Sequence, residues 1–451
     1  MTYRMRILLA VACMMVAMTD AMAQQTKCKE MHKVKRKETL FGIAKDNGIT
    51  IEQLIDANPE MQKQGYELKK GAYICIPYPK QQTKATITET KQQPAEKDVT
   101  QREIRMGVML PLHDNNGDGK RMVEYYRGLL MACDSIKQEG VSVDVRAWNV
   151  EEGADIKSFI KDPAAAKLDV IVGPLYSTQV KDLSAFAKKH DIKLFIPFSI
   201  NVPEGGYNEN VFQVYQNQTN FNAKVIDSFV ENFSSCHVVI VDCNDTTSKK
   251  GVFTFPLRKK LEEKGISQSV TNLKSSEMYF AKAFDRNKRN VVVLNTGRSP
   301  ELTATIAKLN NMKMNNPGIV VSLFGYTDWL LYTKHNLDNF FKYDTYIPAT
   351  FYMNPLSAKT KRINTKYRWN FHADMMQALP RFAITGFDHG YFLLKGLHIY
   401  GKKFTGAAGT VGYAPIQTRL AFEPGEGGAH LNHNLTIVHY KTDNSIETIN
   451  K

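Results

Sequence analysis

The segment LDVIVGPLYSTQVKDLSAFAKKHDIKLFIPFS, residues 168–199, contains the pattern on which the fold of most of the chain depends. Residues 168–175 and 192–199 are short apolar runs of strand length, and residues 177–190 between them place apolar side chains at helical spacing. Apolar strands that alternate with helices are typical of a parallel sheet covered by helices on both faces. The segment therefore predicts an α/β fold.

The same alternation extends in both directions from this segment. Before it lie an apolar run at 104–110, a helical pattern at 123–140 and an alternating run at 141–148. After residue 236 a second series of strands and helices begins with HVVIVDC and continues to GIVVSLFG. Two α/β sets in residues 104–451 predict a domain of two lobes with parallel sheets and a cleft between them, where ligands bind beyond the carboxyl ends of the strands.

A smaller module precedes this domain. Residues 32–36 alternate as a short strand, Thr39 and Thr50 can cap two short helices, and residues 72–77 form a second strand. The order strand, helix, helix, strand in so few residues leaves only a small core. An antiparallel strand pair covered by two helices is therefore predicted for this module, residues 24–78.

Two further segments lack a globular pattern. Residues 1–23 have a positively charged start, a short apolar run and a small-residue cleavage site at 21–23, which together predict a secretory signal peptide. Residues 79–103 are rich in Gln, Thr and Lys, contain no aromatic residue, and are predicted to be a flexible linker. The mature chain is thus expected to be exported to the periplasm or cell envelope, without a transmembrane segment.

Composition excludes several classes of protein. The 451 residues are 43% hydrophobic and 23% charged, as in ordinary globular proteins, which excludes a mainly disordered or collagenous chain. The formal net charge of +14 permits an anionic partner. Because the basic residues are dispersed and the chain is predicted to be exported, nucleic acid is not expected as a partner. Envelope polyanions are the simpler choice.

The cysteines leave their pairing open. Removal of the signal peptide leaves five, an odd number, so at least one is free or pairs with another chain. Cys28 and Cys75 fall in the same small module and can form a disulfide, although two small buried side chains explain them equally well. Cys236 and Cys243 flank one predicted strand and lie roughly 23 Å apart, too far for a disulfide.

The small module resembles the LysM family. Two stretches carry the resemblance, HKVKRKETLFGIAKDNGITIEQLIDANP at residues 32–59 and ELKKGAYICIP at residues 67–77. Their spacing agrees with the family in both strands and both helices, except that Lys37 replaces the usual Gly. The resemblance implies binding of peptidoglycan or another glycan that contains N-acetylglucosamine. It places the binding groove at two loops that carry Glu38, Thr39, Leu40, Asn58, Pro59, Glu60 and Met61.

The two-lobed domain is similar to the type I periplasmic-binding-protein superfamily, which includes branched-chain amino-acid receptors and penicillin-binding-protein activators. The order of RMGVMLPLHD, DVIVGPLYSTQV, KLFIPFSI and FAITGFDHGYFLLKGL carries the resemblance, together with Gly128 and Ala132 in a G-x-x-x-A helix. The cleft loops of the superfamily correspond here to His113, Tyr176, Ser177, Thr178, Ser199, Asp242, Asn295, Thr296 and Tyr326.

The resemblance also bears on the ligand. Ser177 and Thr178 are expected to open a helix, whose free N–H groups suit a small anionic ligand. The first cleft loop, residues 113–124, is polar, and the crossover FQVYQNQ lacks the Arg and Pro of the superfamily. Both departures weaken any transfer of amino-acid specificity to this chain.

The sequence offers no complete catalytic or metal-binding motif. Residues 114–119 are similar to the start of a calcium loop, but its twelfth position is Tyr125 instead of Glu. His433 and His439 are too far apart on a strand to chelate zinc. Because nucleophile motifs and phosphate loops are also missing, the sequence predicts no cofactor, no metal and no enzymatic activity.

Together these features predict a secreted, non-catalytic peptidoglycan-binding protein. Its two-lobed domain is expected to bind a small ligand or a protein of cell-wall synthesis. One alternative is a solute-binding receptor for an ABC transporter or a sensor. Another is a cell-wall hydrolase, which requires a carboxylate pair or a metal site.

Overall fold

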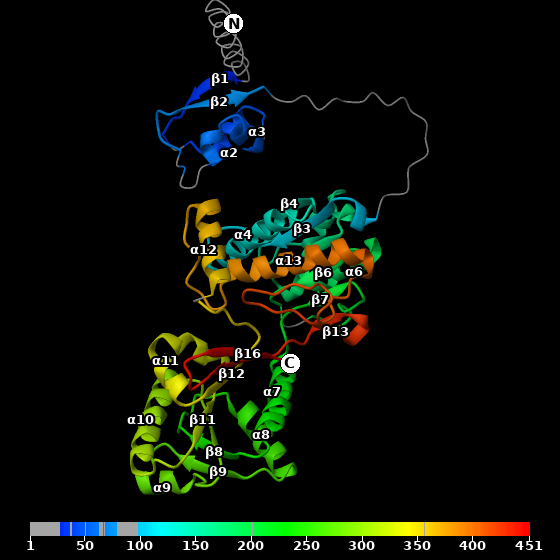
Figure 1. The fold of residues 1–451 in the computed structure, drawn as a ribbon. Coiled ribbons are helices and arrows are strands. Elements are labelled where there is room, and N and C mark those ends of the chain that lie inside the picture. The colour runs from blue at the N-terminus through cyan, green and yellow to red at the C-terminus, as the bar shows by residue number, and fades with distance from the viewer. Residues whose placement is uncertain are drawn as a thin grey trace, which may run out of the picture. The chain divides into compact units, whose positions relative to one another are not determined.

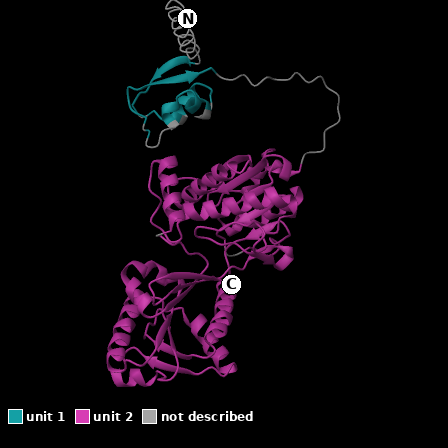
Figure 2. Cartoon of the chain, viewed as in Figure 1, with its two compact units in different colours: residues 1–94 teal, residues 95–451 magenta. Residues whose placement is uncertain are grey.

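The computed structural model describes residues 28–36, 38–49, 51–62, 66, 68–78, 98–199, 202–355 and 357–451. The predicted signal peptide and residues 79–97 of the predicted linker lie outside these ranges. The chain divides into two compact units, residues 1–94 and 95–451, which Figure 2 colours separately. No helix of the described residues is both long and apolar enough to cross a membrane.

The first unit has the predicted order strand, helix, helix, strand (Figure 1). Its elements are β1 (Cys28–Lys33), α2 (Leu40–Asp46), α3 (Ile51–Asp56), the 3-10 turn η1 (Pro59–Gln62) and β2 (Tyr73–Pro77). The strands pair antiparallel, with Met31 opposite Cys75. The first strand was predicted at 32–36 and lies instead at 28–33, because pairing with β2 continues from Lys33 back to Cys28.

The core of this unit lies between the strand pair and the two helices. Val34, Ile43, Leu54, Ile74 and Ile76 are each at most 3% exposed and form its centre. Along β2, Ile74 and Ile76 lie two residues apart and so share one face of the strand, and Cys75 between them is buried as well. So small a core provides limited hydrophobic stabilisation, since a domain of about 60 residues buries a smaller fraction of its surface than a large domain.

The second unit contains two lobes, each with its own sheet. In the described residues of lobe 1 the strand order is β13-β14-β7-β6-β5-β3-β4, parallel except between β13 and β14. The strands are β3 (Ile104–Leu110), β4 (Val143–Asn149), β5 (Val170–Val172), β6 (Lys193–Ile196), β7 (Val211–Gln213), β13 (Phe422–Pro424) and β14 (His430–Asn432). The helices are α4 (Gly117–Lys137), α5 (Ile156–Ile160), α6 (Val180–His190), α12 (Ala358–Phe371) and α13 (Phe382–Tyr400). Short 3-10 turns are η2 (Val99–Gln101), η3 (Ala165–Lys167), η4 (Ser177–Gln179), η6 (Gly401–Lys403) and η7 (Glu426–Gly428).

Lobe 2 repeats this plan with the strand order β16-β15-β12-β11-β10-β8-β9 in the described part of the chain. Its first five strands along the chain are parallel, and β15 and β16 are antiparallel to their neighbours. The strands are β8 (His237–Asp242), β9 (Gln268–Asn272), β10 (Asn290–Leu294), β11 (Val321–Phe324), β12 (Thr345–Ala349), β15 (Thr436–Tyr440) and β16 (Ile446–Asn450). The helices are α7 (Gln218–Phe233), α8 (Gly251–Glu263), α9 (Glu277–Lys282), α10 (Ser299–Asn315) and α11 (Thr333–Lys342), with the 3-10 turn η5 (Thr327–Tyr332). Both lobes confirm the predicted α/β fold with largely parallel sheets.

The chain crosses between the lobes at three places, which we call the hinge. Residues 214–217 lead from β7 to α7, and residues 433–435 lead from β14 to β15. The described residues between β12 and α12 are 350–355 and 357. Lobe 1 is thus completed by a segment that follows lobe 2 in the sequence. The last residues, 436–451, return to lobe 2 and add a hairpin to its sheet.

The end of the predicted linker belongs to lobe 1. Val99 is 3% exposed and packs in the core of this lobe. The guanidinium of Arg102 donates two hydrogen bonds, of 2.8 and 2.7 Å, to the two carboxylate oxygens of Asp169. Residues 98–103 are part of the predicted linker because their composition is polar, but one buried valine and one partly buried ion pair are enough to fix them on the lobe.

Helices α4 and α13 lie side by side in lobe 1, although more than 200 residues separate them in the sequence (Figure 1). Two glycines permit their close approach. A Cβ atom at Gly128 would overlap the carbonyl oxygen of Ala383, and a Cβ atom at Gly386 would overlap that of Tyr125. The backbones of the two helices therefore touch, which explains physically why glycines occupy these positions of the two quoted motifs.

We predict that Gly128→Ala destabilises the second unit by about 3 kcal/mol, because backbone must move to admit the methyl group. This cost exceeds the gain of about 1 kcal/mol that alanine brings to a helix interior. Chemical denaturation of the second unit, followed by tryptophan fluorescence, measures the difference.

The matched control is Gly318→Ala, at a glycine where a Cβ atom would meet no atom within 4 Å. Its effect should stay within about 0.5 kcal/mol. Equal stabilities of the two variants would contradict the close contact between α4 and α13.

Candidate functional site

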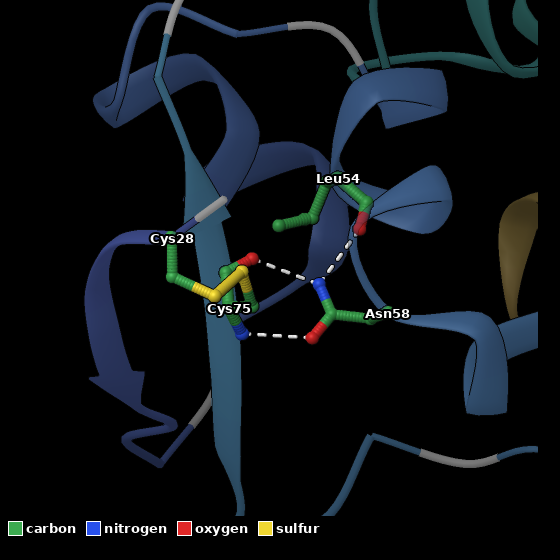
Figure 3. Close-up of a disulfide and its surroundings, with 4 residues drawn as sticks. All are labelled: Cys28, Leu54, Asn58 and Cys75. Carbon is green, nitrogen blue, oxygen red and sulfur yellow. Dashed lines mark hydrogen bonds between the residues drawn. A yellow bond between two sulfur atoms is a disulfide. The ribbon is translucent and has the colours of Figure 1, made fainter. Parts of the chain in front are cut away.

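Asn58 is a structural residue inside the first unit (Figure 3). Its side chain is 3% exposed, and its amide nitrogen donates to the carbonyl oxygens of Leu54 at 2.7 Å and Cys75 at 2.8 Å. Its amide oxygen accepts a 2.7 Å hydrogen bond from the backbone N–H of Cys75. The asparagine thus joins α3 to β2. Of the predicted groove residues, Met61 is also buried, at 7% exposure.

The other predicted groove residues lie nearer the surface. Thr39 is exposed and caps α2, with its hydroxyl oxygen accepting a 3.0 Å hydrogen bond from the N–H of Gly42. Glu38 accepts hydrogen bonds from the backbone N–H of Lys35 at 2.6 Å and from the His32 ring at 2.9 Å, and these contacts lower the pKa of its carboxyl. Leu40 is half-buried against the core, whereas Pro59 and Glu60 are exposed.

A disulfide links the two strands of this unit (Figure 3). Cys28 and Cys75 are bonded across 47 residues of sequence, which decides the alternative that the sequence left open. Cys133, Cys236 and Cys243 are free thiols. Burial raises the pKa of the Cys133 and Cys243 thiols to about 12, so neither is a reactive thiolate at neutral pH.

The structure brings the predicted cleft residues of lobe 1 to one edge of its sheet. The hydroxyl groups of Ser177 and Ser199 lie 2.9 Å apart, so the loops after β5 and β6 meet. Tyr176 reaches Asp118 at 3.5 Å, and Thr178 is exposed. His113 packs against Gly119 at the start of α4. Ser177 and Thr178 lie in the short turn η4 ahead of α6, rather than in the first turn of a long helix.

The predicted cleft residues of lobe 2 bind groups within the lobe, and two of them, Asp242 and Asn295, bind each other. The amide nitrogen of Asn295 donates to Asp242 at 2.9 Å, and its oxygen accepts from the N–H of Cys243 at 2.9 Å. Thr296 donates a 2.7 Å hydrogen bond to Asp245. A side-chain hydrogen bond from Thr247, followed by this one from Thr296, lowers the pKa of Asp245 to about 2. These residues tie the loops after β8 and β10 together.

A pocket of about 510 Å³ lies at the hinge, and we call it the hinge pocket. Lobe 1 contributes the residues that follow β6 and β7, together with part of α13 and of the segments around 380, 418 and 432. Lobe 2 contributes the first turns of α7 and α8 and the residues around the ends of β11 and β12. Of the nine predicted cleft residues, Tyr326 alone lines this pocket. Its hydroxyl donates a 2.5 Å hydrogen bond to the carbonyl oxygen of Leu294.

One wall of the hinge pocket depends on Asp388 of α13. This carboxyl is fully buried and accepts hydrogen bonds from the Tyr413 hydroxyl at 2.5 Å and from the backbone N–H groups of Ile416, Gln417 and Thr418 at 2.9, 2.7 and 2.8 Å. Burial raises the pKa of Asp388, while the four donors act in the opposite direction. The contacts hold residues 416–418 against α13 and so position Thr418 at the pocket.

His389, the next residue of α13, also lines the hinge pocket. It is 1% exposed, and its Nδ1 lies 3.0 Å from the hydroxyl of Tyr125 on α4. Burial lowers the pKa of His389 to about 3, so the ring is neutral at physiological pH. Its Nε2 atom and the hydroxyl of Thr418 are buried without a hydrogen-bond partner in the described structure.

The charges at the hinge pocket come from lobe 2. Lys249 and Lys250 precede α8, and Asp328 follows β11. The ammonium of Lys250 lies 2.5 Å from the Asp328 carboxylate and 4.7 Å from the centre of the Tyr326 ring. In the ranges that the structure describes, no group of three His, Cys, Asp or Glu side chains could hold a metal ion.

The sequence predicted a cleft between the two lobes, but of the nine residues assigned to it only Tyr326 lines the hinge pocket. The position of a pocket at strand ends can be predicted from the order of the strands. The hinge pocket is also lined by the crossings between the lobes and by α13, whose positions the strand order does not give. A usable signal was the pair Asp388-His389 in the otherwise apolar stretch FAITGFDHGYFLL, because polar residues at buried helical positions need partners or a function.

Comparison with known proteins agrees with this architecture. Residues 32–77 match the LysM domain family, and this part of the chain is a LysM domain. No curated protein is significantly similar in sequence to the chain.

Solved structures resemble the second unit. A protein from Rhodospirillum rubrum, described as a branched-chain amino acid ABC transporter, matches 77% of this chain and 100% of its own, with a TM-score of 0.52 and 14% sequence identity. A branched chain amino acid ABC transporter periplasmic ligand-binding protein from Burkholderia xenovorans matches 77% of this chain and 94% of its own, with a TM-score of 0.44 and 12% identity. The Rhodospirillum structure establishes that the second unit has the two-lobed fold of type I periplasmic binding proteins.

We predict that replacing both Cys28 and Cys75 by Ser destabilises the LysM domain by about 4 kcal/mol, since the closed loop of nearly 50 residues limits the unfolded chain. Calorimetry of the full chain should show a lower melting temperature for the LysM transition and an unchanged transition for the second unit.

The control is Cys133→Ser, which removes a free thiol of the second unit. It should leave the LysM transition unchanged. A LysM transition that did not respond to loss of the disulfide would show that the small core alone suffices.

Proposed function

We propose that this is an exported, non-enzymatic protein of the cell envelope, which binds peptidoglycan through its LysM domain and a small ligand in the hinge pocket. The observation that carries the proposal is the combination, in one chain, of a LysM domain with a two-lobed binding-protein fold that has a 510 Å³ pocket at its hinge. Ligand pockets in proteins generally have volumes of about 300–1,000 Å³.

Exposed groove residues support the peptidoglycan part of the proposal. Thr39, Pro59 and Glu60 are accessible at the two loops to which the LysM resemblance assigns glycan binding. Asn58 and Met61 act from beneath by fixing the second loop on the core. We therefore assign direct glycan contact to the exposed residues and a supporting role to the buried ones.

The disulfide supports export. Bonds between cysteines persist in oxidising compartments such as the periplasm and are rare in the cytosol. The Cys28–Cys75 bond therefore agrees with the signal peptide predicted at residues 1–23, which lies outside the described residues. The periplasm or the cell envelope is the location proposed here.

Binding of a small ligand is favoured over docking of a cell-wall-synthesis protein by the position of the pocket. A ligand at the hinge contacts both lobes and can change the angle between them, as in hinge closure around a ligand. The same geometry would serve a solute receptor of an ABC transporter. The LysM domain favours a protein that remains on the cell wall.

The absence of enzymatic activity is also a proposal. Hydrolysis of a glycan requires two carboxyl groups on either side of the bond that is cleaved. Among the residues that line the hinge pocket, Asp328 is the single acid, and it is paired with Lys250. The described residues at this pocket therefore lack the acid and base that a hydrolase of this kind needs.

Wall binding can be tested by sedimentation. We predict that the purified chain pellets with insoluble peptidoglycan, and that deletion of residues 24–78 abolishes pelleting, because the glycan contacts lie in the LysM domain. Pro59→Ala combined with Glu60→Ala should weaken pelleting.

Met31→Ser serves as the control for this experiment, since Met31 is 56% exposed on β1 and lies outside the predicted groove. It should pellet like the unchanged chain. Equal pelleting of the chain without residues 24–78 would refute the assignment of wall binding to the LysM domain.

Catalysis can be tested by product release. We predict that incubation with purified peptidoglycan yields no soluble muropeptides above a heat-inactivated control, measured by liquid chromatography and mass spectrometry. Time-dependent release that disappears in Asp328→Asn would overturn the non-enzymatic proposal and locate the activity in the hinge pocket.

A further inference from the structure

The hinge pocket has one charged side and one uncharged side. Lys249, Lys250 and Asp328 all belong to lobe 2. None of the pocket-lining residues that belong to lobe 1 or to the hinge is Asp, Glu, Lys or Arg. A charged group of a ligand that entered the uncharged side would lose its hydration without gaining an opposite charge, which is costly.

Two hydrogen-bonding groups on the uncharged side have no partner in the described structure. They are Nε2 of His389 and the hydroxyl of Thr418, in side chains that are 1% and 9% exposed. A buried polar group without a partner costs roughly 1–3 kcal/mol, so such groups call for an explanation. Both residues line the same pocket, and a ligand that supplies hydrogen bonds there would remove this cost.

The neutral state of His389 defines what can bind. A neutral imidazole has one donor and one acceptor nitrogen, and a hydroxyl group both donates and accepts. The contact with Tyr125 uses Nδ1, so Nε2 takes the complementary role. A ligand hydroxyl or amide can match either assignment of the ring proton, whereas a carboxylate can only accept and an ammonium can only donate.

The rest of the lining fits the same chemistry. Uncharged amide and hydroxyl side chains, among them Gln216, Asn222 and Thr350, are interspersed with aromatic rings such as Phe198 and Phe253. Sugar rings present hydroxyl groups at their edges and C–H groups on their faces. Polar side chains that both donate and accept suit the edges, and aromatic rings suit the faces.

A free amino acid fits less well. It needs an anionic partner for its ammonium group and a cationic partner for its carboxylate. The single carboxylate that lines the hinge pocket, Asp328, is already paired with Lys250. Using it for a ligand would break that ion pair.

We propose that the hinge pocket binds an uncharged saccharide, and that His389 Nε2 and the Thr418 hydroxyl form hydrogen bonds with it at the uncharged side. This inference rests on the proposed small-ligand function and specifies its ligand class. It replaces the small anionic ligand that was expected at Ser177 and Thr178, two residues that do not line the pocket.

Tryptophan fluorescence can separate this pocket from the LysM domain. The three tryptophans of the chain are Trp148, Trp329 and Trp369, all in the second unit. Trp329 is buried, and its ring centre lies 6.4 Å from that of Tyr326, which lines the pocket. A response of these tryptophans therefore reports on the second unit, and we expect it to persist after deletion of residues 24–78.

The experiment titrates the full chain with N-acetylglucosamine, its β-1,4-linked disaccharide, glucose and maltose, and in parallel with leucine and glutamate. We expect a saturable fluorescence change with at least one sugar and none with the amino acids. Saturation by an amino acid without any response to a sugar would overturn the ligand class and leave the small-ligand function intact. No response to any of the six compounds would overturn both.

Three variants test the two contacts. Thr418→Val and His389→Asn should each lower the affinity for the sugar by about three- to tenfold, because each removes one hydrogen bond. The side-chain amide of asparagine can replace Nδ1 in the contact with Tyr125, but it does not reach the position of Nε2. His389→Gln, whose amide reaches the position of Nε2, should bind better than His389→Asn.

The matched control is Thr305→Val. Thr305 is fully buried in α10 and does not line the pocket, so this change also removes a buried hydroxyl but should leave sugar affinity unchanged. Thermal unfolding of each variant without sugar checks that it folds. Unchanged sugar affinity in folded Thr418→Val and His389→Asn would overturn the two contacts.

Discussion

The contact between the backbones of α4 and α13 is the constraint on which the second unit depends. Gly128 and Gly386 let the two helices touch, and their closeness joins a segment near residue 390 to the first helix of lobe 1. Because α13 is held in this way, Asp388 and His389 lie inside the lobe rather than at its surface. Asp388 then fixes residues 416–418 by hydrogen bonds, and these bonds position Thr418 in the wall of the hinge pocket.

Buried polar groups have two different roles in this protein. Asn58 and Asp388 are satisfied by several hydrogen bonds each, and both attach an irregular segment to a regular element. Such groups specify one arrangement of the chain, because any shift leaves a donor or acceptor buried without a partner. His389 and Thr418 are buried as well but each keeps an unpaired atom. His389 and Thr418 also line the hinge pocket, and this position, together with their unpaired atoms, is the basis of the proposed ligand contacts.

The candidate site was predictable only where it depends on strand order. Ser177 and Ser199 follow neighbouring parallel strands, so their meeting at 2.9 Å follows from the sheet topology. The same holds for Asp242 and Asn295. What could not be predicted is that four of the nine candidate residues would bind one another in two pairs, and that eight of the nine would not line the hinge pocket. Hydrogen-bond partners depend on side-chain directions and loop geometry, which a pattern of residue types does not contain.

The sequence by itself determined the local elements of this protein. Apolar periodicity predicted most of the strands and helices from residue 104 to β11, and the LysM spacing predicted the small domain, because both patterns depend on residues close together in the sequence. Strands β12 to β16 were not among these predictions. The tertiary structure alone decided the Cys28–Cys75 pairing, the attachment of residues 98–103 to lobe 1 and the hinge pocket. These features require residues far apart in the sequence to meet. Such meetings are set by the packing of whole elements, such as α13 on α4, and not by the spacing of residues along either one.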